Sequence, residues 1–324
     1  MRASGTSARP LPMSSPERIC VVGAGLMGHG IAQVFACAGH PVAVQDPSGE
    51  ALATVHARVA ANLARLGLTD AALGRITVLE DLADALDGAA FVFEAAPERV
   101  DLKVRLIEEI TAIAPAGVIV ASNTSSMPVA AYTPRAVGAE RVIGTHFWNP
   151  PYLIPLVEVV QGERTSAETV ARTMAVLSAA GKLPVHVRRD VPGFVANRLQ
   201  HALWREAMAI VQNGIADAET VDLCVKNSFG LRLAVMGPLE TADLGGLDQV
   251  LNIHEQILPF IDRTPGPLRI LRDKVATGQL GMKTGQGFLP WTEEAATAAH
   301  ARLADHLIAA LATKKAPPDA RTTT

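Results

Sequence analysis

One stretch near the N-terminus constrains the fold of this chain more than any other. An apolar run that ends at Val22 leads directly into Gly23-Ala24-Gly25-Leu26-Met27-Gly28. We expect Gly23 to make a tight turn, Gly25 to let the backbone approach a ligand, and Gly28 to let a strand and a helix pack closely. We expect a helix to begin at Gly25-Leu26. Such a turn presents free backbone N–H groups at the positive end of the helix, where an anion binds.

A second apolar run, Val42–Gln45, is followed at once by Asp46. An acidic side chain about 20 residues after the glycines accepts hydrogen bonds from the ribose of a bound dinucleotide. Its charge would repel the 2′-phosphate of NADP, and Pro47-Ser48-Gly49 contains no arginine to bind one. The pattern therefore predicts a Rossmann-type dinucleotide site that takes NAD. The alternative is a glycine-rich turn in which Asp46 merely caps a helix.

Length and composition narrow the class of protein. A chain of 324 residues exceeds the usual size of one core, which favours two domains. The net charge of −3 disfavours a nucleic acid partner. The three cysteines show neither metal nor disulfide spacing, and no apolar run is long enough to span a membrane. Residues 1–15 lack a secretory pattern and are expected to form a disordered leader in which Met13 is a second candidate start. We expect a cytoplasmic protein without a metal.

Apolar strands alternate with amphipathic helices as far as Asp190. The alternation predicts helices over residues 49–66, 100–115 and 167–180, and later strands over 76–79, 91–95, 118–121, 141–145, 156–160 and 185–187. Beyond Asp190 we expect a long helix over 192–212, another around 218–225, and then further helices joined by Gly/Pro loops. The expected architecture is a doubly wound, mostly parallel α/β domain over 16–189, an all-α domain over 190–313 and a disordered tail over 314–324.

Polar side chains follow several predicted strands, where ligands bind in an open α/β sheet. Glu98 and Asn123 each follow a strand, and His146 follows another. Glu158 lies inside an apolar strand, where a carboxylate is costly unless something pairs with it. His146, one strand away, is the natural partner. The alternative is that His146 caps a strand and Glu158 faces solvent on an edge strand.

These residues lie within a larger resemblance. Over residues 17–291 the chain is similar to the 3-hydroxyacyl-CoA dehydrogenase family in six ordered motifs. They are Ser-Asn-Thr-Ser-Ser at 122–126, His-Phe-Trp-Asn-Pro at 146–150, Leu-Val-Glu at 156–158, Pro-Gly-Phe-Val-Ala-Asn-Arg at 192–198, Met-Gly-Pro-Leu-Glu at 236–240 and Gly-Met-Lys-Thr-Gly-Gln-Gly-Phe at 281–288.

The resemblance implies an NAD-dependent oxidation of a 3-hydroxyacyl-CoA to a 3-oxoacyl-CoA, as in fatty acid metabolism, by a homodimer formed through the helical domain. It implies that His146 is the catalytic base, that Glu158 orients it, and that Ser125 and Asn197 hold the reacting oxygen. Because Asn197 follows Asp190, the site would be completed across the cleft between the domains. Cofactor contacts are then expected from Gly23, Ala24, Gly25, Leu26, Met27, Gly28, Asp46, Glu98, Lys103, Asn123, Ser125 and Asn149.

The residue types suit that chemistry without the resemblance. An imidazole, with an ordinary pKa near 6.5, can remove a hydroxyl proton near neutral pH while hydride leaves for the cofactor. A carboxylate on its other nitrogen fixes the tautomer and stabilises the imidazolium. Ser125 and Asn197 can donate hydrogen bonds to the oxygen as charge develops. The alternative for Asn197 is packing at the start of a helix.

The sequence leaves more than one class of substrate open. Residues 1–102 contain no lysine, and the segment 50–66 offers only His56, Arg58 and Arg65 to the phosphates of coenzyme A. Asn149-Pro150-Pro151-Tyr152 also resembles relatives that act on small acids, such as gulonate and carnitine dehydrogenases. Arg58, Arg198 and Arg232 are the candidate substrate cations, although both Arg198 and Arg232 could instead form surface or interface salt bridges.

Two other classes of function stay open. One is an NAD-binding protein without catalysis, which the intact set Ser125, His146, Glu158 and Asn197 disfavours. The other is oxidation of a hydrated aldehyde by the same base. Such a reaction would proceed without a covalent thioester, since no cysteine is expected near His146.

Overall fold

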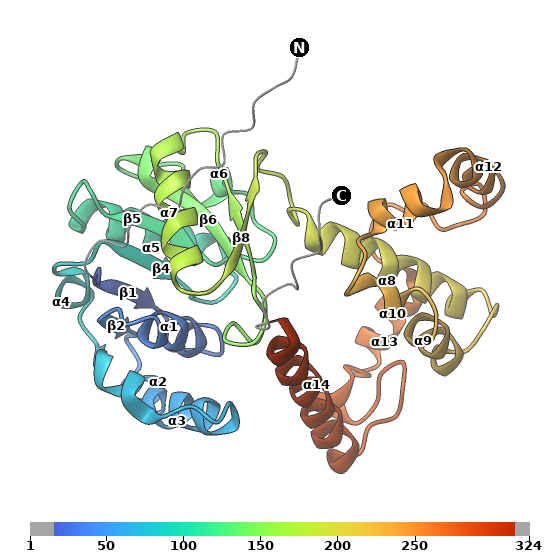
Figure 1. Cartoon of the computed structure of the whole chain (residues 1–324), viewed down its shortest axis with the longest axis horizontal. Coiled ribbons are helices and arrows are strands. Elements are labelled where there is room, and N and C mark those ends of the chain that lie inside the picture. The colour runs from blue at the N-terminus through green and yellow to red at the C-terminus, as the bar shows by residue number, and fades with distance from the viewer. Residues whose placement is uncertain (1–15, 315–324) are drawn as a thin grey trace, which may run out of the picture. The chain divides into compact units, whose positions relative to one another are not determined.

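The computed structural model describes residues 16–314 and divides them into two compact units (Figure 1). One unit holds residues 16–197 together with 307–314, and the other holds Arg198–His306. The predicted leader, 1–15, lies outside the described residues. So does the predicted tail, except for Lys314, at which the last helix ends.

The first unit is built on an eight-stranded sheet with the order β3-β2-β1-β4-β5-β6-β7-β8 (Figure 1). Every neighbouring pair is parallel except β6 and β7, which are antiparallel. Because β1 lies centrally between β2 and β4, the chain reverses its winding there, as in a doubly wound fold. The strands are β1 (Ile19–Val22), β2 (Val42–Gln45), β3 (Ile76–Leu79), β4 (Phe91–Glu94), β5 (Ile119–Ser122), β6 (Val142–Phe147), β7 (Leu156–Val160) and β8 (Leu183–Val187).

Helices cover both faces of this sheet, and each face has its own apolar core. On one face Ile31 and Phe35 of α1, Val59 of α3 and Leu177 of α7 pack together. On the other face, apolar side chains of α4, α5 and α6 pack together with Phe194. The helices are α1 (Gly28–Cys37), α2 (Gly49–Ala53), α3 (Val55–Arg65), α4 (Leu82–Leu86), α5 (Val100–Ile113), α6 (Val129–Tyr132) and α7 (Ala167–Ala179), with short 3₁₀ turns at Asp70–Arg75 and Ala139–Arg141.

The second unit is helical and buries few apolar side chains of its own. Within residues 198–306 the buried apolar side chains are Ala209 and Leu268. The helices are α8 (Ala196–Gln212), α9 (Ala218–Lys226), α10 (Gly230–Leu233), α11 (Pro238–Gly245), α12 (Leu247–Ile257), α13 (Arg269–Ala276) and α14 (Glu293–Lys314), with a 3₁₀ turn at Met282–Thr284. No helix among the described residues is long and apolar enough to cross a membrane.

The α/β fold with a helical C-terminal region is confirmed, but four expected boundaries are wrong. The helix expected over 49–66 is two helices, because the Thr54 hydroxyl donates to Ala51 O at 2.9 Å and interrupts the ladder. The first helix begins at Gly28 rather than Gly25. The strand expected to stop at Thr145 continues to Phe147, so His146 lies within β6.

The long helix begins at Ala196 and not at Pro192. Gly193 and Phe194 have φ values of 75° and 50°, a left-handed backbone that no helix can contain. Asn197 lies in the first turn of α8, directly before the boundary between the two units, and groups with the sheet unit.

Candidate active site

The turn between β1 and α1 has the geometry that a dinucleotide requires. Gly23 has a φ of 104°, and a Cβ there would lie 2.8 Å from Ala95 O. A Cβ on Gly28 would lie 1.7 Å from Gly23 O, so strand and helix could not pack this closely with any other residue. A Cβ on Gly25, in contrast, would meet nothing within 4 Å. The chain thus leaves space at Gly25 for the backbone to meet a pyrophosphate.

Asp46, directly after β2, is held by the same turn. Its Oδ2 accepts a hydrogen bond from Ala24 N at 2.8 Å, and its Oδ1 accepts one from Ser48 N at 2.9 Å. The carboxylate therefore has a fixed place beside the glycines, at the carboxyl edge of the sheet. This is the position from which an acidic side chain binds the ribose hydroxyls of NAD. The residues present fit that cofactor.

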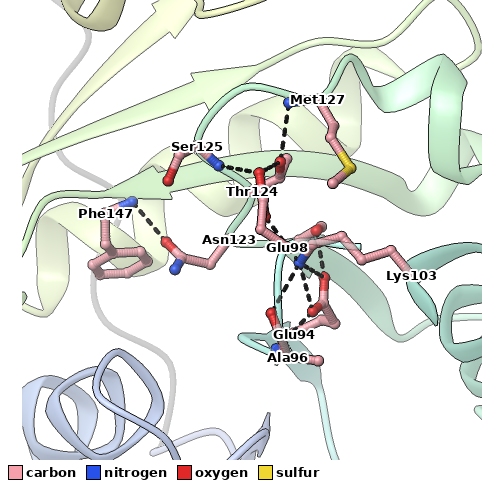
Figure 2. A network of polar contacts seen from close by, with 10 residues as sticks. Glu94, Ala96, Glu98, Lys103, Asn123, Thr124, Ser125, Met127 and Phe147 are labelled. Atoms are coloured by element: carbon pink, nitrogen blue, oxygen red, sulfur yellow. Dashed lines mark hydrogen bonds and ion pairs between the residues drawn. The ribbon is translucent and has the colours of Figure 1, made fainter. Parts of the chain in front are cut away.

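A buried ion pair connects β4, β5 and α5 at the same edge (Figure 2). Lys103 Nζ donates to both carboxylate oxygens of Glu94, at 2.8 and 3.0 Å, and both side chains are fully buried. Ser122 Oγ donates to the second oxygen of Glu94 at 2.5 Å, and Ala96 N donates to the first at 2.7 Å. With these partners the buried charges are satisfied, which holds the turn after β4 in one shape.

Glu98 links this pair to the turn after β5 (Figure 2). Its Oε1 accepts from Thr124 Oγ1 at 2.5 Å and from Ser125 N at 3.0 Å, while its Oε2 lies 3.6 Å from Lys103 Nζ. Asn123 Oδ1 accepts from Phe147 N at 2.9 Å, which ties the same turn to the end of β6. Ser125 is thereby fixed by its backbone while its side chain stays exposed.

His146 and Glu158 form a buried pair across two antiparallel strands. They are directly opposite in the β6–β7 register, and Nδ1 of His146 lies 2.8 Å from Oε2 of Glu158. The two residues are 4% and 1% exposed. Because an ionised carboxylate can only accept, the contact places a proton on Nδ1 and leaves Nε2 as the basic nitrogen. The alternative of a solvent-facing Glu158 on an edge strand is excluded, since β7 lies between β6 and β8.

The second oxygen of Glu158 is bound by the segment that leads into α8. Its Oε1 accepts from Val195 N at 2.9 Å and from Ala196 N at 3.0 Å. Burial alone would raise the pKa of Glu158, but hydrogen bonds from His146 and from these two backbone N–H groups lower it below its usual value. The carboxylate is therefore ionised at neutral pH.

Two aromatic rings lie beside the histidine. The rings of Trp148 and Phe194 lie 5.1 and 5.7 Å from the imidazole, centroid to centroid. Asn197 Nδ2 donates to Ser125 O at 2.7 Å, so the start of α8 is tied to the turn after β5. The carboxyl edge of the sheet therefore carries the His146–Glu158 pair and the contact between Asn197 and Ser125.

The other residues singled out from the sequence lie as follows. Arg58 does not extend freely from α3, because its Nη1 donates to Ala24 O of the glycine-rich turn at 3.0 Å. Asn149 is exposed at the start of the loop after β6. Arg198 and Arg232 belong to the helical unit. Among the described residues, no group of His, Cys, Asp and Glu could hold a metal ion.

Sequence reasoning missed several contributors to this edge. Glu94 stands out in the sequence as a polar residue at the end of an apolar strand, but the pattern assigns it no role. The contacts from the backbone N–H groups of Val195 and Ala196 could not be predicted, because they do not depend on the identity of the side chains. Trp148 and Phe194 lie inside the motifs that carry the resemblance, but they were not assigned a role.

A dinucleotide turn with a ribose-binding acid and a buried His–Glu pair, at one edge of a doubly wound sheet, defines an NAD-dependent dehydrogenase. Residues 18–191 match the family model of the 3-hydroxyacyl-CoA dehydrogenase NAD-binding domain. Residues 193–291 match that of the 3-hydroxyacyl-CoA dehydrogenase C-terminal domain. The chain belongs to the 3-hydroxyacyl-CoA dehydrogenase family.

Similar proteins of known name differ in their substrates. A 5-formyl-3-hydroxy-2-methylpyridine 4-carboxylate 5-dehydrogenase from Mesorhizobium japonicum is 33% identical over 298 residues, which are 90% of this chain and 96% of the relative. An L-carnitine dehydrogenase from Streptomyces coelicolor is 44% identical over 241 residues, 72% of this chain and 76% of the relative. A crystal structure of a 5-formyl-3-hydroxy-2-methylpyridine 4-carboxylic acid 5-dehydrogenase, described as an NAD⁺-dependent dismutase, gives a TM-score of 0.85 at 33% identity, covering 91% of this chain and 97% of that one.

Proposed function

We propose that this chain oxidises the 3-hydroxyl of an acid or acyl thioester to a ketone, with His146 as the base. The observation that carries the proposal is the buried pair of His146 and Glu158, whose second imidazole nitrogen is left basic. NAD, when bound, accepts the hydride from the carbinol carbon. The protein's part is to remove the hydroxyl proton and to orient the substrate.

In this proposal Nε2 of His146 takes the hydroxyl proton, and Glu158 stabilises the imidazolium that forms. Glu158 suits that task because its own oxygens are fully engaged, by His146 on one side and by two backbone N–H groups on the other. A carboxylate held in this way cannot turn away when the imidazole becomes charged.

Ser125 and Asn197 would hold the reacting oxygen. The contact between Asn197 Nδ2 and Ser125 O keeps the two side chains together and uses only one of the two amide hydrogens. Within residues 16–314 the Ser125 hydroxyl makes no hydrogen bond of its own. Two donors are thus available to an oxygen on which negative charge develops.

Around the cofactor we assign direct contacts to Gly23, Ala24, Gly25, Leu26, Met27, Gly28 and Asp46, and on the nicotinamide side to Glu98, Asn123, Ser125 and Asn149. Lys103 acts in this proposal through its neighbours, since its ammonium is fully buried on Glu94 and lies 3.6 Å from Glu98. The family's description favours a 3-hydroxyacyl-CoA substrate. We propose fatty acid metabolism as the place of such a reaction.

A second candidate is the same oxidation of a compact acid that carries no coenzyme A. Basic side chains in the segment 50–66 are engaged within the first unit: Arg58 donates to Ala24 O, and His56 lies 3.1 Å from Ile76 O. Side chains engaged in this way are less available to a phosphate-rich handle. The names of the two relatives above, a carnitine and a pyridine-carboxylate dehydrogenase, also favour a small acid. Arg198 and Arg232 are then the candidates for its carboxylate.

A hydrated aldehyde is a further candidate substrate, supported by the formyl compound in the name of one relative and by the dismutase description of the similar structure. A hydrated aldehyde carries a hydroxyl on the carbon that loses hydride, so the same base can act on it.

We further infer a homodimer formed through residues 198–306, placed in the cytoplasm. Large apolar side chains of this unit are exposed, among them Leu251 at 61%, Leu258 at 45% and Phe260 at 87%. A cavity of about 680 Å³ opens beside them and is lined by Leu251, Leu258, Pro259 and Ile261 together with charged side chains. Exposed apolar surface of this extent is typical of a subunit interface.

The inferred location in the cytoplasm is supported by the three cysteines, which are free, as they would be in a reducing compartment.

The test is a screen for NADH formation by the wild-type chain and by His146→Gln. The substrates are 3-hydroxybutyryl-CoA, free 3-hydroxybutyrate, gulonate, carnitine and an aromatic aldehyde. Oxidation of any one by the wild type, and its loss in the variant, supports the proposal and assigns the substrate class. NADH binding without turnover of any compound would instead indicate an NAD-binding protein without catalysis.

A further inference from the structure

The loop Asn149–Pro155 connects β6 to β7 at the edge of the sheet that carries the site. It follows His146 after only two residues and begins with Asn149. Its own hydrogen bonds are few: the N–H groups of Leu153 and Ile154 both donate to Pro150 O, each at 3.0 Å. Because the loop has few internal hydrogen bonds, contacts with neighbouring elements must hold it in one conformation.

On one side the loop packs against α1. A Cβ on Gly30 would lie 2.5 Å from Pro151 Cγ and 3.4 Å from Tyr152 Cδ1, so the helix admits the loop only because residue 30 has no side chain. Gly30 comes two residues after Gly28 of the dinucleotide turn. The loop and the dinucleotide turn therefore both contact the first turn of α1.

On the other side the loop is held by Lys182, which directly precedes β8. Lys182 Nζ donates to Pro151 O, and to Ile154 O at 2.7 Å. Among the described residues no carboxylate pairs with this ammonium, and its burial lowers the pKa of Lys182 to about 8. A half-buried charge without a counter-ion is costly to keep. Two charge-assisted hydrogen bonds to carbonyls of the loop offset this cost.

We propose that Lys182 is a positioning residue that clamps the loop Asn149–Pro155 against α1 and so fixes the nicotinamide side of the cofactor site. Lys182 is not among the residues that we assign to the cofactor or to the reacting atoms. It acts through the carbonyls of Pro151 and Ile154, and the side chain of Pro151 in turn packs against α1 at Gly30. The inference rests on the proposed function only in assigning Asn149 to the cofactor, and NADH binding can be measured without any substrate.

The experiment compares Lys182→Met with Lys226→Met in the full chain. Lys226 is the matched control, because it is an exposed lysine in the helical unit and pairs with Asp222 at 3.0 Å. We expect Lys182→Met to bind NADH about tenfold more weakly in a fluorescence titration, through loss of charge-assisted hydrogen bonds. Hydrogen exchange at the amides of Leu153 and Ile154 should become faster, while Lys226→Met matches the wild type in both measurements.

A chemical rescue separates the clamp from a general role in folding. Lys182→Cys, treated with 2-bromoethylamine, regains an ammonium at nearly the original distance from the backbone. NADH affinity and slow exchange in the loop should both return, whereas the treated wild type, in which Cys37 and Cys224 also react, should not change. Wild-type NADH affinity and wild-type loop exchange in Lys182→Met would overturn the proposal. So would a failure of aminoethylation to restore NADH binding to a folded Lys182→Cys protein.

Discussion

The role that we propose for His146 depends on the different surroundings of its two ring nitrogens. Glu158 occupies Nδ1 at 2.8 Å, and no hydrogen bond among residues 16–314 occupies Nε2. The rings of Trp148 and Phe194 hold the imidazole from its sides. Because the imidazole is already oriented, the proposed proton transfer requires little further loss of conformational entropy.

His146→Gln should therefore retain NADH affinity and lose turnover by about 10²–10⁴-fold, the usual contribution of a general base. Glutamine keeps a polar side chain of similar length but cannot accept and carry a proton. Steady-state turnover together with an NADH titration checks this expectation. Turnover equal to that of the wild type would exclude His146 from the mechanism.

Glu158→Gln should lower turnover by about a hundredfold or more and change the pH–rate profile, because the imidazolium loses its counter-charge. It should also alter acid stability. The pKa of Glu158 is lowered in the folded state, so its ionised form stabilises the fold above the ordinary glutamate pKa. That stability disappears as the pH falls through the lower, folded-state pKa. Chemical denaturation across this acidic range should show the loss in the wild type and not in the variant.

The pairing of His146 with Glu158 could be predicted from sequence, because a carboxylate between valines must find a partner. The two backbone donors to Glu158 could not. They depend on the left-handed backbone at Gly193 and Phe194, which directs the chain so that Val195 N and Ala196 N face the carboxylate. Such a turn is set by the packing of Phe194 into the core of one sheet face, which no local pattern records.

Among the secondary-structure elements, the β1–α1 unit was the most predictable and offers the sharpest test. Gly25→Ala should leave stability unchanged and weaken NADH binding, since a methyl group there meets no protein atom within 4 Å. Gly28→Ala should destabilise the fold itself, by about 1–3 kcal/mol, because its Cβ would lie 1.7 Å from Gly23 O.

Thermal unfolding and NADH titration of both variants distinguish the two effects. Loss of stability in Gly25→Ala, or full stability in Gly28→Ala, would contradict the roles assigned to these glycines. The comparison needs no substrate and is independent of the catalytic proposal.

Element boundaries were less predictable than element types. Apolar periodicity runs through residues 49–66 without a break, yet Thr54 ends one helix and begins the next through its side-chain hydrogen bond. The extension of β6 to Phe147 likewise depends on pairing with β7, a partner distant in sequence. The end of β6 thus depends on a tertiary contact, and the break at Thr54 on a local side-chain hydrogen bond that apolar periodicity does not record.

At the scale of the whole molecule, the buried apolar side chains are distributed unevenly between the two units. The first unit has a core on both faces of its sheet, whereas Arg198–His306 buries only two apolar side chains, Ala209 and Leu268. A helical unit with so small a core is poorly stabilised alone. This imbalance is the reason to expect that a second copy covers it.

The dimer can be tested with a matched pair of substitutions. Leu258 in the helical unit and Ile113 in the sheet unit are each 45% exposed. Leu258→Glu should shift the chain toward monomer or aggregate in sedimentation velocity, because it places a charge in the inferred interface. Ile113→Glu should sediment as the wild type does. A monomeric wild type would remove the dimer from the proposal.

The antiparallel pairing of β6 and β7 has one more consequence. Side chains alternate between the two faces of a strand, so the residue opposite His146 faces the imidazole only if the connecting segment has the right length. If the pairing of the two strands shifted by one residue, Val157 or Val159 would lie opposite His146 in place of Glu158. The length of this connection, and not only its composition, therefore matters to the proton transfer that we propose.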